Sequence, residues 1–397
     1  MNKKSAVTIL TTQSASNSSV KSLNINNDTN ESELISNIKN SLFFRAYNLF
    51  LWLFIVIAGI LVFFLIVEIY SRKAIYTGRA YNFEQNQLDI ENKEAATQKV
   101  DIQSMWPKTD FSKSQINLDT IYSAGPSRDA IPAIKNPKFV LANSINKIDL
   151  ADSDKGVFVQ IGNIAKFYPL NILVWHEVVN DNIGASPFAV TYCPLTGTTL
   201  VFSRNSNDTP SGMMTFGVSG LLYKSNLVLY DVETESLWSQ VERTSIVGAN
   251  VASKLEALSF QLMTFSQAQK RAPSLMVLTT DTGYVRDYKN NPYQSYEISD
   301  EVYSEFGLSY DQPDYPAKKS IISFENQGIK YGLLADDLVL GKIVNFIDAN
   351  GNILVVRNED GFIDISFNGQ NIDDFSFEYW FSWIKSAEST KLFKLNA

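Results

Sequence analysis

The chain has 397 residues, of which 45% are apolar and only 19% charged, with 34 basic and 42 acidic side chains, one Cys and one His. This composition suits about two or three ordinary domains and excludes wholesale disorder. The net charge of -8 argues against nucleic acid as a partner, because phosphate binding needs a basic face. A single Cys allows no intrachain disulfide and no zinc site with two thiolates, and a single His excludes a three-histidine site.

The N-terminal part of the chain predicts a polar tail followed by a membrane anchor. Residues 1–48 are rich in Asn and Ser and are expected to be disordered, whereas residues 49–67, LFLWLFIVIAGILVFFLIV, contain no charge. A helix of that length reaches about 28 Å, close to the hydrocarbon thickness of a bilayer. The stretch is too long and begins too late for a signal peptide. We therefore predict a single-pass transmembrane helix, about 46–70 with its flanks, although the flanking charges do not decide its orientation.

The remaining chain predicts a strand-rich fold. Residues 68–117 are polar and read as a stalk or linker, and beyond them short β-branched and aromatic runs such as KGVFVQIG, PFAVTYC and NLVLYD alternate with turns. This pattern favours an α+β domain with largely antiparallel sheets and a few helices, among them PLNILVW and FSQAQKRA. Residues 156–181 resemble 320–348 in the order of their elements, and 263–278 resemble 379–394. We expect a duplicated domain, with a first repeat over 118–312 and a shortened second repeat over 313–397.

The only His and the only Cys lie 17 residues apart, in WHEVVNDNIGASPFAVTYC. If these residues form a hairpin, a turn at Gly184-Ala185 places His176 opposite Cys193, and a turn one residue earlier leaves the two diagonal. Both registers put His176 and Cys193 on one face of the sheet, because side chains alternate with a period of two. A bulge or a one-residue turn would separate them.

A shared face allows two hypotheses and an inert alternative. In the first, His176 and Cys193 bind one transition metal (copper, iron or zinc), with oxygen ligands such as Asp231 and Glu235. In the second, His176 lowers the thiol pKa and Cys193 is a nucleophile, with backbone N–H groups of the following PLTG turn stabilising the developing charge. The alternative is a buried thiol and a hydrogen-bonded imidazole without a chemical role.

The segment 216–240, FGVSGLLYKSNLVLYDVETESLWSQ, holds the second concentration of unusual residues. Gly217 and Gly220 flank Ser219, which predicts a tight loop, and a hairpin is expected around residues 232–235. Three carboxylates, Asp231, Glu233 and Glu235, would share a face if this stretch stays extended. They could bind a cation, act as acid and base, or hydrogen-bond a sugar stacked on Trp238; the alternative is a solvated turn.

These motifs carry a resemblance to a known family. The succession AKFYPLNILVWHEVVND, VTYCPLTGT, FGVSGLLYKSNLVLYD and ETESLWSQ resembles the family catalogued as domain of unknown function 3179, over about 118–300 and more weakly to about 390. The resemblance implies no particular reaction, but members often carry export signals or anchors, which favours an extracytoplasmic domain. Many members have a second Cys where this chain has Thr196, so two-thiolate chemistry is not available here. The motif positions of the family fall on His176, Glu177, Asn180, Asp181, Cys193, Gly217, Ser219, Gly220, Trp238 and Gln240.

The sequence thus predicts a membrane-anchored extracytoplasmic protein with a metal-binding or catalytic site on a His/Cys hairpin. His176, Cys193 and Glu177 are the expected catalytic residues. The expected substrate-binding residues are Asn180, Asp181, Ser219, Trp238 and Gln240. The alternative is a non-enzymatic module that binds a glycan or peptide through Trp175, Trp238, Tyr223 and Tyr230. The lipid bilayer is the partner that the sequence predicts, through residues 49–67. The sequence indicates neither a reaction nor an oligomeric state.

Overall fold

The computed structural model describes residues 102–145, 150–206, 209, 211–303, 308, 310, 314–348, 351–386 and 389–393, with 57, 59 and 62. The chain divides into two compact units, Met1–Thr97 and Gln98–Ala397. The predicted tail and nearly all of the predicted anchor at 49–67 lie outside the described residues, so both stay predictions. Within the residues that the structure describes, no helix is long and apolar enough to cross a membrane.

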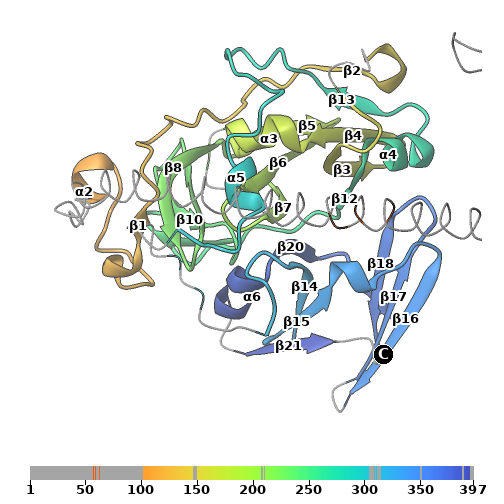
Figure 1. Cartoon of the computed structure of the whole chain (residues 1–397). Helices are drawn as coiled ribbons and strands as arrows, with labels where there is room; N and C mark the ends of the chain where they lie inside the picture. The colour runs from red at the N-terminus through yellow and green to blue at the C-terminus, as the bar shows by residue number, and fades with distance from the viewer. Residues whose placement is uncertain are drawn as a thin grey trace, which may run out of the picture. The chain divides into compact units, whose positions relative to one another are not determined.

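The second unit is built from four sheets and a few short helices, which confirms an α+β fold with mostly antiparallel strands (Figure 1). One sheet has the order β1-β8-β9-β10-β11: β1 Tyr122–Ser123, β8 Phe216–Tyr223, β9 Asn226–Asp231, β10 Leu237–Ser239 and β11 Thr244–Val247. Another has the order β12-β3-β4-β13-β2: β12 Gln261–Thr264, β3 Lys155–Ile161, β4 Ile164–Pro169, β13 Met276–Leu278 and β2 Phe139–Leu141.

The other two sheets contain the predicted hairpin and most of the C-terminal strands. The seven-stranded sheet runs β21-β15-β14-β20-β7-β6-β5: β21 Thr390–Phe393, β15 Ile329–Leu334, β14 Ser320–Asn326, β20 Phe375–Tyr379, β7 Thr198–Ser203, β6 Ser186–Cys193 and β5 Val178–Ile183. The four-stranded sheet runs β16-β17-β18-β19: β16 Lys342–Asp348, β17 Gly351–Arg357, β18 Ile363–Phe367 and β19 Gln370–Asn371. Only the pairs β4·β13 and β15·β21 are parallel among the described strands.

The helices are short and their ends follow from local sequence. They are α2 Ile102–Met105, α3 Leu170–His176, α4 Phe265–Arg271, α5 Gln294–Glu297 and α6 Trp380–Ser386, with 3-10 turns η2 Leu118–Thr120, η3 Ala142–Ser144 and η5 Ala335–Asp337. The predicted helices at PLNILVW and FSQAQKRA are α3 and α4. Pro169 directly precedes α3, and α4 begins with a capping box between Thr264 and Gln267. Part of the predicted stalk is packed rather than extended as a linker: Trp106 is fully buried and packs edge-on against Tyr230.

Two parts of the unit share strand order, direction and register. The order β12-β3-β4-β13 recurs as β20-β14-β15-β21. In each set the two outer strands are connected by a seven-residue helix, α4 in the first set and α6 in the second. Thr264 pairs with Lys155 as Tyr379 pairs with Ser320, and each directly precedes its helix. Met276 pairs with Lys166 as Lys391 pairs with Tyr331. The arrangement is what the predicted duplication would produce; duplication itself, and its boundaries, stay a prediction.

The second of these parts encloses a buried ion pair. Lys330 Nζ lies 2.6 Å from the Glu378 carboxylate, and the two side chains are 10% and 0% exposed. The Ser323 hydroxyl donates to the same carboxylate at 2.5 Å. A buried pair of this kind is stable only while both partners are present, because each charge has lost its water.

We predict that Glu378→Ala destabilises the protein by about 3–5 kcal/mol, because it leaves the Lys330 ammonium buried without its counter-charge. The matched control is Asp336→Ala, which breaks the exposed Lys319–Asp336 pair and should change the free energy of unfolding by less than about 1 kcal/mol. Urea unfolding of both variants measures the difference. Equal effects of the two substitutions would show that the buried ion pair stabilises the protein no more than the exposed one.

Candidate functional site

The predicted hairpin exists, and one of its two predicted registers is correct. Strands β5 and β6 pair antiparallel from Val178↔Thr191 to Ile183↔Ser186, so the turn is Gly184-Ala185. Gly184 has a φ of +60°, a conformation that glycine adopts without strain. The turn chemistry therefore fixes which residues of the two strands face each other.

His176 does not lie on this hairpin, which corrects the expectation that it faces Cys193 across two strands. Helix α3 continues through His176, and the strand begins only at Val178. The imidazole is fully buried: Nδ1 donates to the Pro132 carbonyl at 2.7 Å, and Nε2 accepts from the Tyr288 hydroxyl at 2.7 Å. Burial lowers the pKa of His176. Its described contacts fasten the segments around Pro132 and Tyr288 and do not involve Cys193.

Glu177, rather than the predicted His176, is the residue that lies beside Cys193. It is the cap of α3, with a φ of +58°, and its N–H donates to the Leu173 carbonyl at 2.7 Å. Glycine is the usual residue in this left-handed conformation, so a glutamate here is strained. Its side chain is only 6% exposed, and its carboxyl group has no hydrogen bond or ion pair to any described residue. An unpaired carboxyl group inside a protein is costly and calls for a chemical reason.

Glu177 and Cys193 line the same cavity. The cavity measures about 60 Å³, which holds a few waters or a group of a few heavy atoms, since one water needs roughly 10–15 Å³. Leucines of β8, β9 and the turn after β6 form part of its walls. The lining residues are Ala124, Pro126, Ile131, Glu177, Cys193, Leu195, Val218, Gly220, Leu221, Leu222, Leu227, Tyr293 and Tyr303.

Burial decides the protonation of both groups. It raises the pKa of Glu177 from 4.5 to about 8, so the carboxyl group is mostly protonated at neutral pH. Burial, and then the nearby Glu177 charge, raise the pKa of the Cys193 thiol to about 11. The Thr196 hydroxyl and the N–H groups of Thr196 and Leu195 act in the opposite direction, because they favour the thiolate. At pH 7 both Glu177 and Cys193 are therefore mostly neutral and can act as proton donors.

The cavity wall explains the G-V-S-G motif. Strands β8 and β9 change register between Val218 and Leu221, and Gly220 sits in this bulge with a φ of +76°. A Cβ at Gly220 would come within 2.0 Å of the Pro126 carbonyl oxygen, so only glycine lets the segment around Pro126 close over the cavity. Ser219 is a structural residue: its hydroxyl donates to the Val228 carbonyl and accepts from the Leu221 N–H.

The chain matches the model of a family described as "Protein of unknown function (DUF3179)" over residues 128–374. It belongs to this family. The match includes the hairpin, the bulge of β8 and both Glu177 and Cys193, and the family description names no reaction. No curated protein and no solved structure matches the chain.

The proposed substrate-binding residues of this DUF3179 chain hold the fold together around the cavity. Asp181 forms a buried ion pair with Lys166 at 2.8 Å and accepts from the Tyr168 hydroxyl at 2.6 Å. The Asn180 amide bonds both backbone groups of Phe216, each at 2.8 Å, and so ties β5 to β8. Gln240 donates to the Thr191 hydroxyl at 3.0 Å, while its Oε1 is buried with no partner among the described residues.

The proposed metal ligands Asp231 and Glu235 lie in the β9–β10 hairpin and have partners of their own. Asp231 accepts from the Trp238 indole at 2.9 Å and from the Thr234 hydroxyl, so Trp238 is buried and presents no stacking surface. Glu235 pairs with Arg128 at 3.0 Å. Over the residues that the structure describes, no group of three His, Cys, Asp or Glu side chains could hold a metal ion.

Sequence reasoning missed the residues that cover the cavity. Tyr293 and Tyr303 come from the long segment 279–303, which is fastened by Tyr288 to His176 and by the Tyr296 hydroxyl to the Leu195 carbonyl at 2.8 Å. Burial raises the pKa of Tyr293. Several tyrosines within a few residues of one another were the visible pattern, but nothing local in the sequence indicates where this segment packs.

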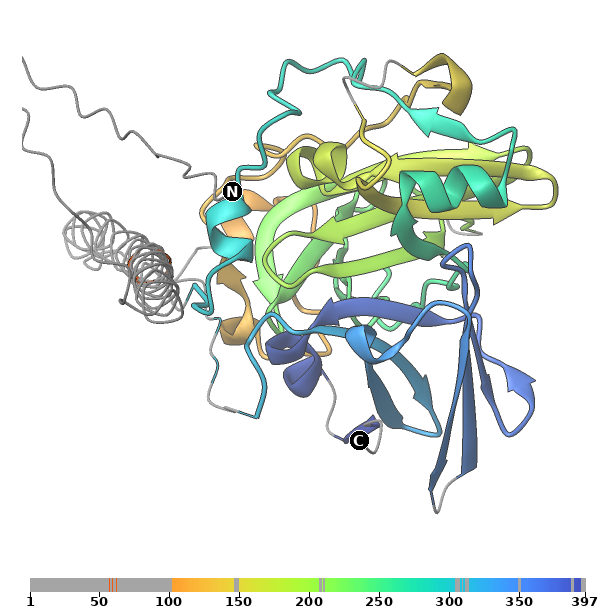
Figure 2. The same ribbon diagram turned by 45° about the vertical axis from the view of Figure 1, so that its right-hand side comes forward.

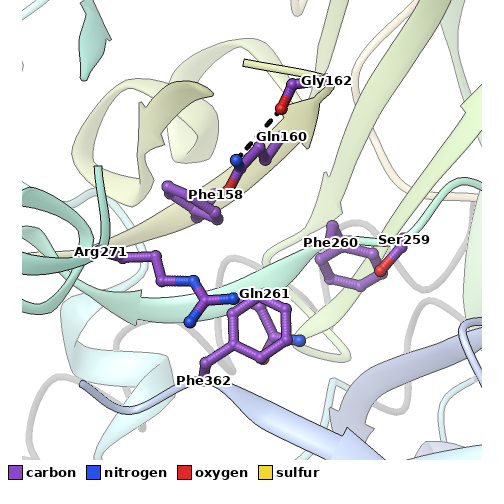
Figure 3. A pocket seen from close by; sticks show the side chains of 8 residues that line it. All are labelled: Phe158, Gln160, Gly162, Ser259, Phe260, Gln261, Arg271 and Phe362. Carbon is purple, nitrogen blue, oxygen red and sulfur yellow. Dashed lines mark hydrogen bonds between the residues drawn. The ribbon is translucent and has the colours of Figure 1, made fainter. Parts of the chain in front are cut away.

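A second, larger hollow of about 290 Å³ lies beside β3 and β12 (Figure 3). Phe158 and Phe260 form its apolar wall, and Arg271 stacks over Phe362 at 4.3 Å. Most of its polar groups already have partners: the Gln261 amide bonds both backbone groups of Ile363, and Arg271 pairs with Asp360 at 3.2 Å. Unlike the cavity at Cys193, it contains no unpaired buried acid.

We predict that Glu177→Gln removes a pH dependence of stability. The unfolded glutamate ionises near pH 4.5, whereas the folded one stays protonated to about pH 8, so wild-type stability falls between these values. Glutamine cannot ionise, and the variant should gain on the order of a few kcal/mol relative to wild type between pH 4 and pH 8.5.

Urea unfolding at these two pH values measures the difference. The matched control is Glu325→Gln, whose side chain is exposed and which should leave the pH dependence unchanged. Parallel stability curves for wild type and Glu177→Gln would show that the carboxyl group is not held in its protonated form.

Proposed function

We propose that the cavity at Glu177 and Cys193 is the functional site of a membrane-anchored protein whose folded unit lies outside the cytoplasm. One observation carries the site: a carboxyl group that is 6% exposed, has no described partner and lines a cavity with the only thiol of the chain. The anchor rests on the uncharged stretch at residues 49–67. The location of the folded unit rests on the export signals and anchors expected from the family resemblance.

In this proposal Glu177 is the acid–base group of the site. A pKa of about 8 lies close to neutral pH, where a side chain can both give and accept a proton. When Glu177 is ionised it can take the proton of the Cys193 thiol, so that the S–H bond breaks as an O–H bond forms. The resulting thiolate lies near the N–H groups of Leu195 and Thr196, which stabilise negative charge. Cys193 is then the nucleophile and Glu177 its base.

The walls define the class of group that enters. Leu195, Leu221 and Leu227 make the cavity apolar, and its volume of about 60 Å³ admits only a small part of a larger molecule. A charged group would lose its water without gaining a counter-charge. The site therefore suits a small, uncharged electrophilic group, to which protonated Glu177 can donate a hydrogen bond.

Two further hypotheses remain open to direct tests. Copper, iron or zinc could use Cys193 and Glu177 as two ligands, and metal analysis of the purified full-length protein tests this reading. Of the four aromatic residues predicted for a non-enzymatic glycan- or peptide-binding role, Trp238 and Tyr230 are buried, whereas Trp175 and Tyr223 are half-buried. The aromatic hollow beside Phe158 and Phe362 is a further place for this role, and a glycan panel tests it.

The acid–base pair predicts a specific pattern of thiol reactivity. In full-length protein in detergent, a small thiol-directed probe should label Cys193 slowly at pH 7.5, because burial raises its pKa to about 11. Glu177→Gln removes the proposed base and should lower labelling at pH 8, where about half of the wild-type Glu177 side chains are ionised, by roughly tenfold or more.

The matched control is His176→Gln, which changes the neighbouring residue but, in our proposal, leaves the labelling rate at pH 8 unchanged. A rate that falls in His176→Gln and stays unchanged in Glu177→Gln would restore the histidine as the partner of Cys193. An unreactive thiol in all three proteins over the whole pH range would count against any nucleophilic role.

A further inference from the structure

Strand β16 is an open sheet edge that lacks the usual protection. It is the outermost strand of the sheet β16-β17-β18-β19, and among the described strands only β17 pairs with it (Figure 1). Figure 2 shows the hairpin of β16 and β17 as the long blue pair of strands. Natural edge strands are protected by prolines, bulges or inward charges. The pairing of β16 with β17 is unbroken from Lys342 to Asp348, and the five residues between these two, IVNFI, contain no charge, Pro or Gly.

The outer face of this edge is apolar. Ile343 is 68% exposed and Ile347 76%, and both lie on the side of β16 that faces away from the buried Val344 and Phe346. On β17, Leu354 adds a 36% exposed side chain to the same face, opposite Asn345. Exposed β-branched residues beside an open edge are typical of a strand that pairs with another chain.

We propose that β16 pairs antiparallel with β16 of a second copy of this chain, about a two-fold axis at Asn345. In this register Ile343 lies opposite the partner's Ile347, and Val344 opposite the partner's Phe346. Lys342 lies opposite the partner's Asp348, so residues of opposite charge meet at both ends. The sequence KIVNFID is thus complementary to itself when reversed, and the two four-stranded sheets become one.

Charge favours a second copy and this register over the alternatives. Within its own hairpin Lys342 lies opposite Arg357, a residue of the same sign, and no ion pair of Lys342 occurs among the described residues. Sliding the two strands by two residues would set Lys342 against the partner's Phe346 or leave it beyond the pairing. Only the register centred on Asn345 pairs every charge with its opposite and every apolar residue with an apolar one.

Charge reversal tests the register. In sedimentation of full-length protein in detergent over a range of concentrations, wild type should show a monomer–dimer equilibrium. Lys342→Glu and Asp348→Lys should each raise the dimer Kd roughly tenfold, because the symmetry changes two cross-strand pairs at once. The double variant restores opposite charges and should return the Kd to within about threefold of wild type.

A cross-link tests the axis. Oxidation of Asn345→Cys should join two chains, because facing residues of paired strands are close enough for a disulfide, whereas Asp364→Cys on β18 should not, and native Cys193 is buried. A monomer at every concentration, or a double variant no better than the single ones, overturns the proposal. So does a monomer in which the Asn345→Cys thiol is protected from labelling, since another segment would then cover the edge.

Discussion

The structure around the cavity depends on one backbone reversal, at the residue between α3 and β5. Glu177 is forced into a left-handed conformation because the helix ends and the strand begins within two residues. That reversal sends the Glu177 and His176 side chains into different surroundings. Glu177 meets the thiol and the leucines of β8 and β9, while His176 meets Pro132 and Tyr288. The strain and the unpaired carboxyl group both oppose folding, and the surrounding polar contacts hold them in place.

Several of these contacts are made by residues that the sequence assigns to substrate binding, among them Asn180, Asp181 and Trp238. Lys166 and Tyr168 hold Asp181 within β5, and the Asn180 amide connects the hairpin to the strand that bears the bulge. Asp231 and Trp238 close the next hairpin with their own hydrogen bond. Motifs rich in polar residues can thus mark the support of a site rather than its chemistry, because buried polar groups need partners wherever they lie.

The sequence was informative where a local rule applies. Strand alternation and the turn residues predicted the hairpin and limited its register to two alternatives, and Pro169 marked the start of α3. The same rules failed at His176, since a seven-residue helix and a strand leave similar apolar patterns over so short a run. Nothing local predicted that Tyr293 and Tyr303 would cover the cavity, because their positions depend on contacts with residues about a hundred positions away.

The turn after Cys193 is tied to the far end of the chain. Asn226 accepts from the hydroxyls of Thr196 and Thr198 and donates to the Ser382 hydroxyl in α6 at 2.9 Å. Strand β7, which follows this turn, pairs with β20 only at Thr199↔Phe377. A chain leaving the ribosome therefore makes the thiol and the carboxyl group long before it makes the residues that complete their surroundings. Until Tyr293, Tyr303 and Ser382 are made, the surroundings of the acid and the thiol are incomplete.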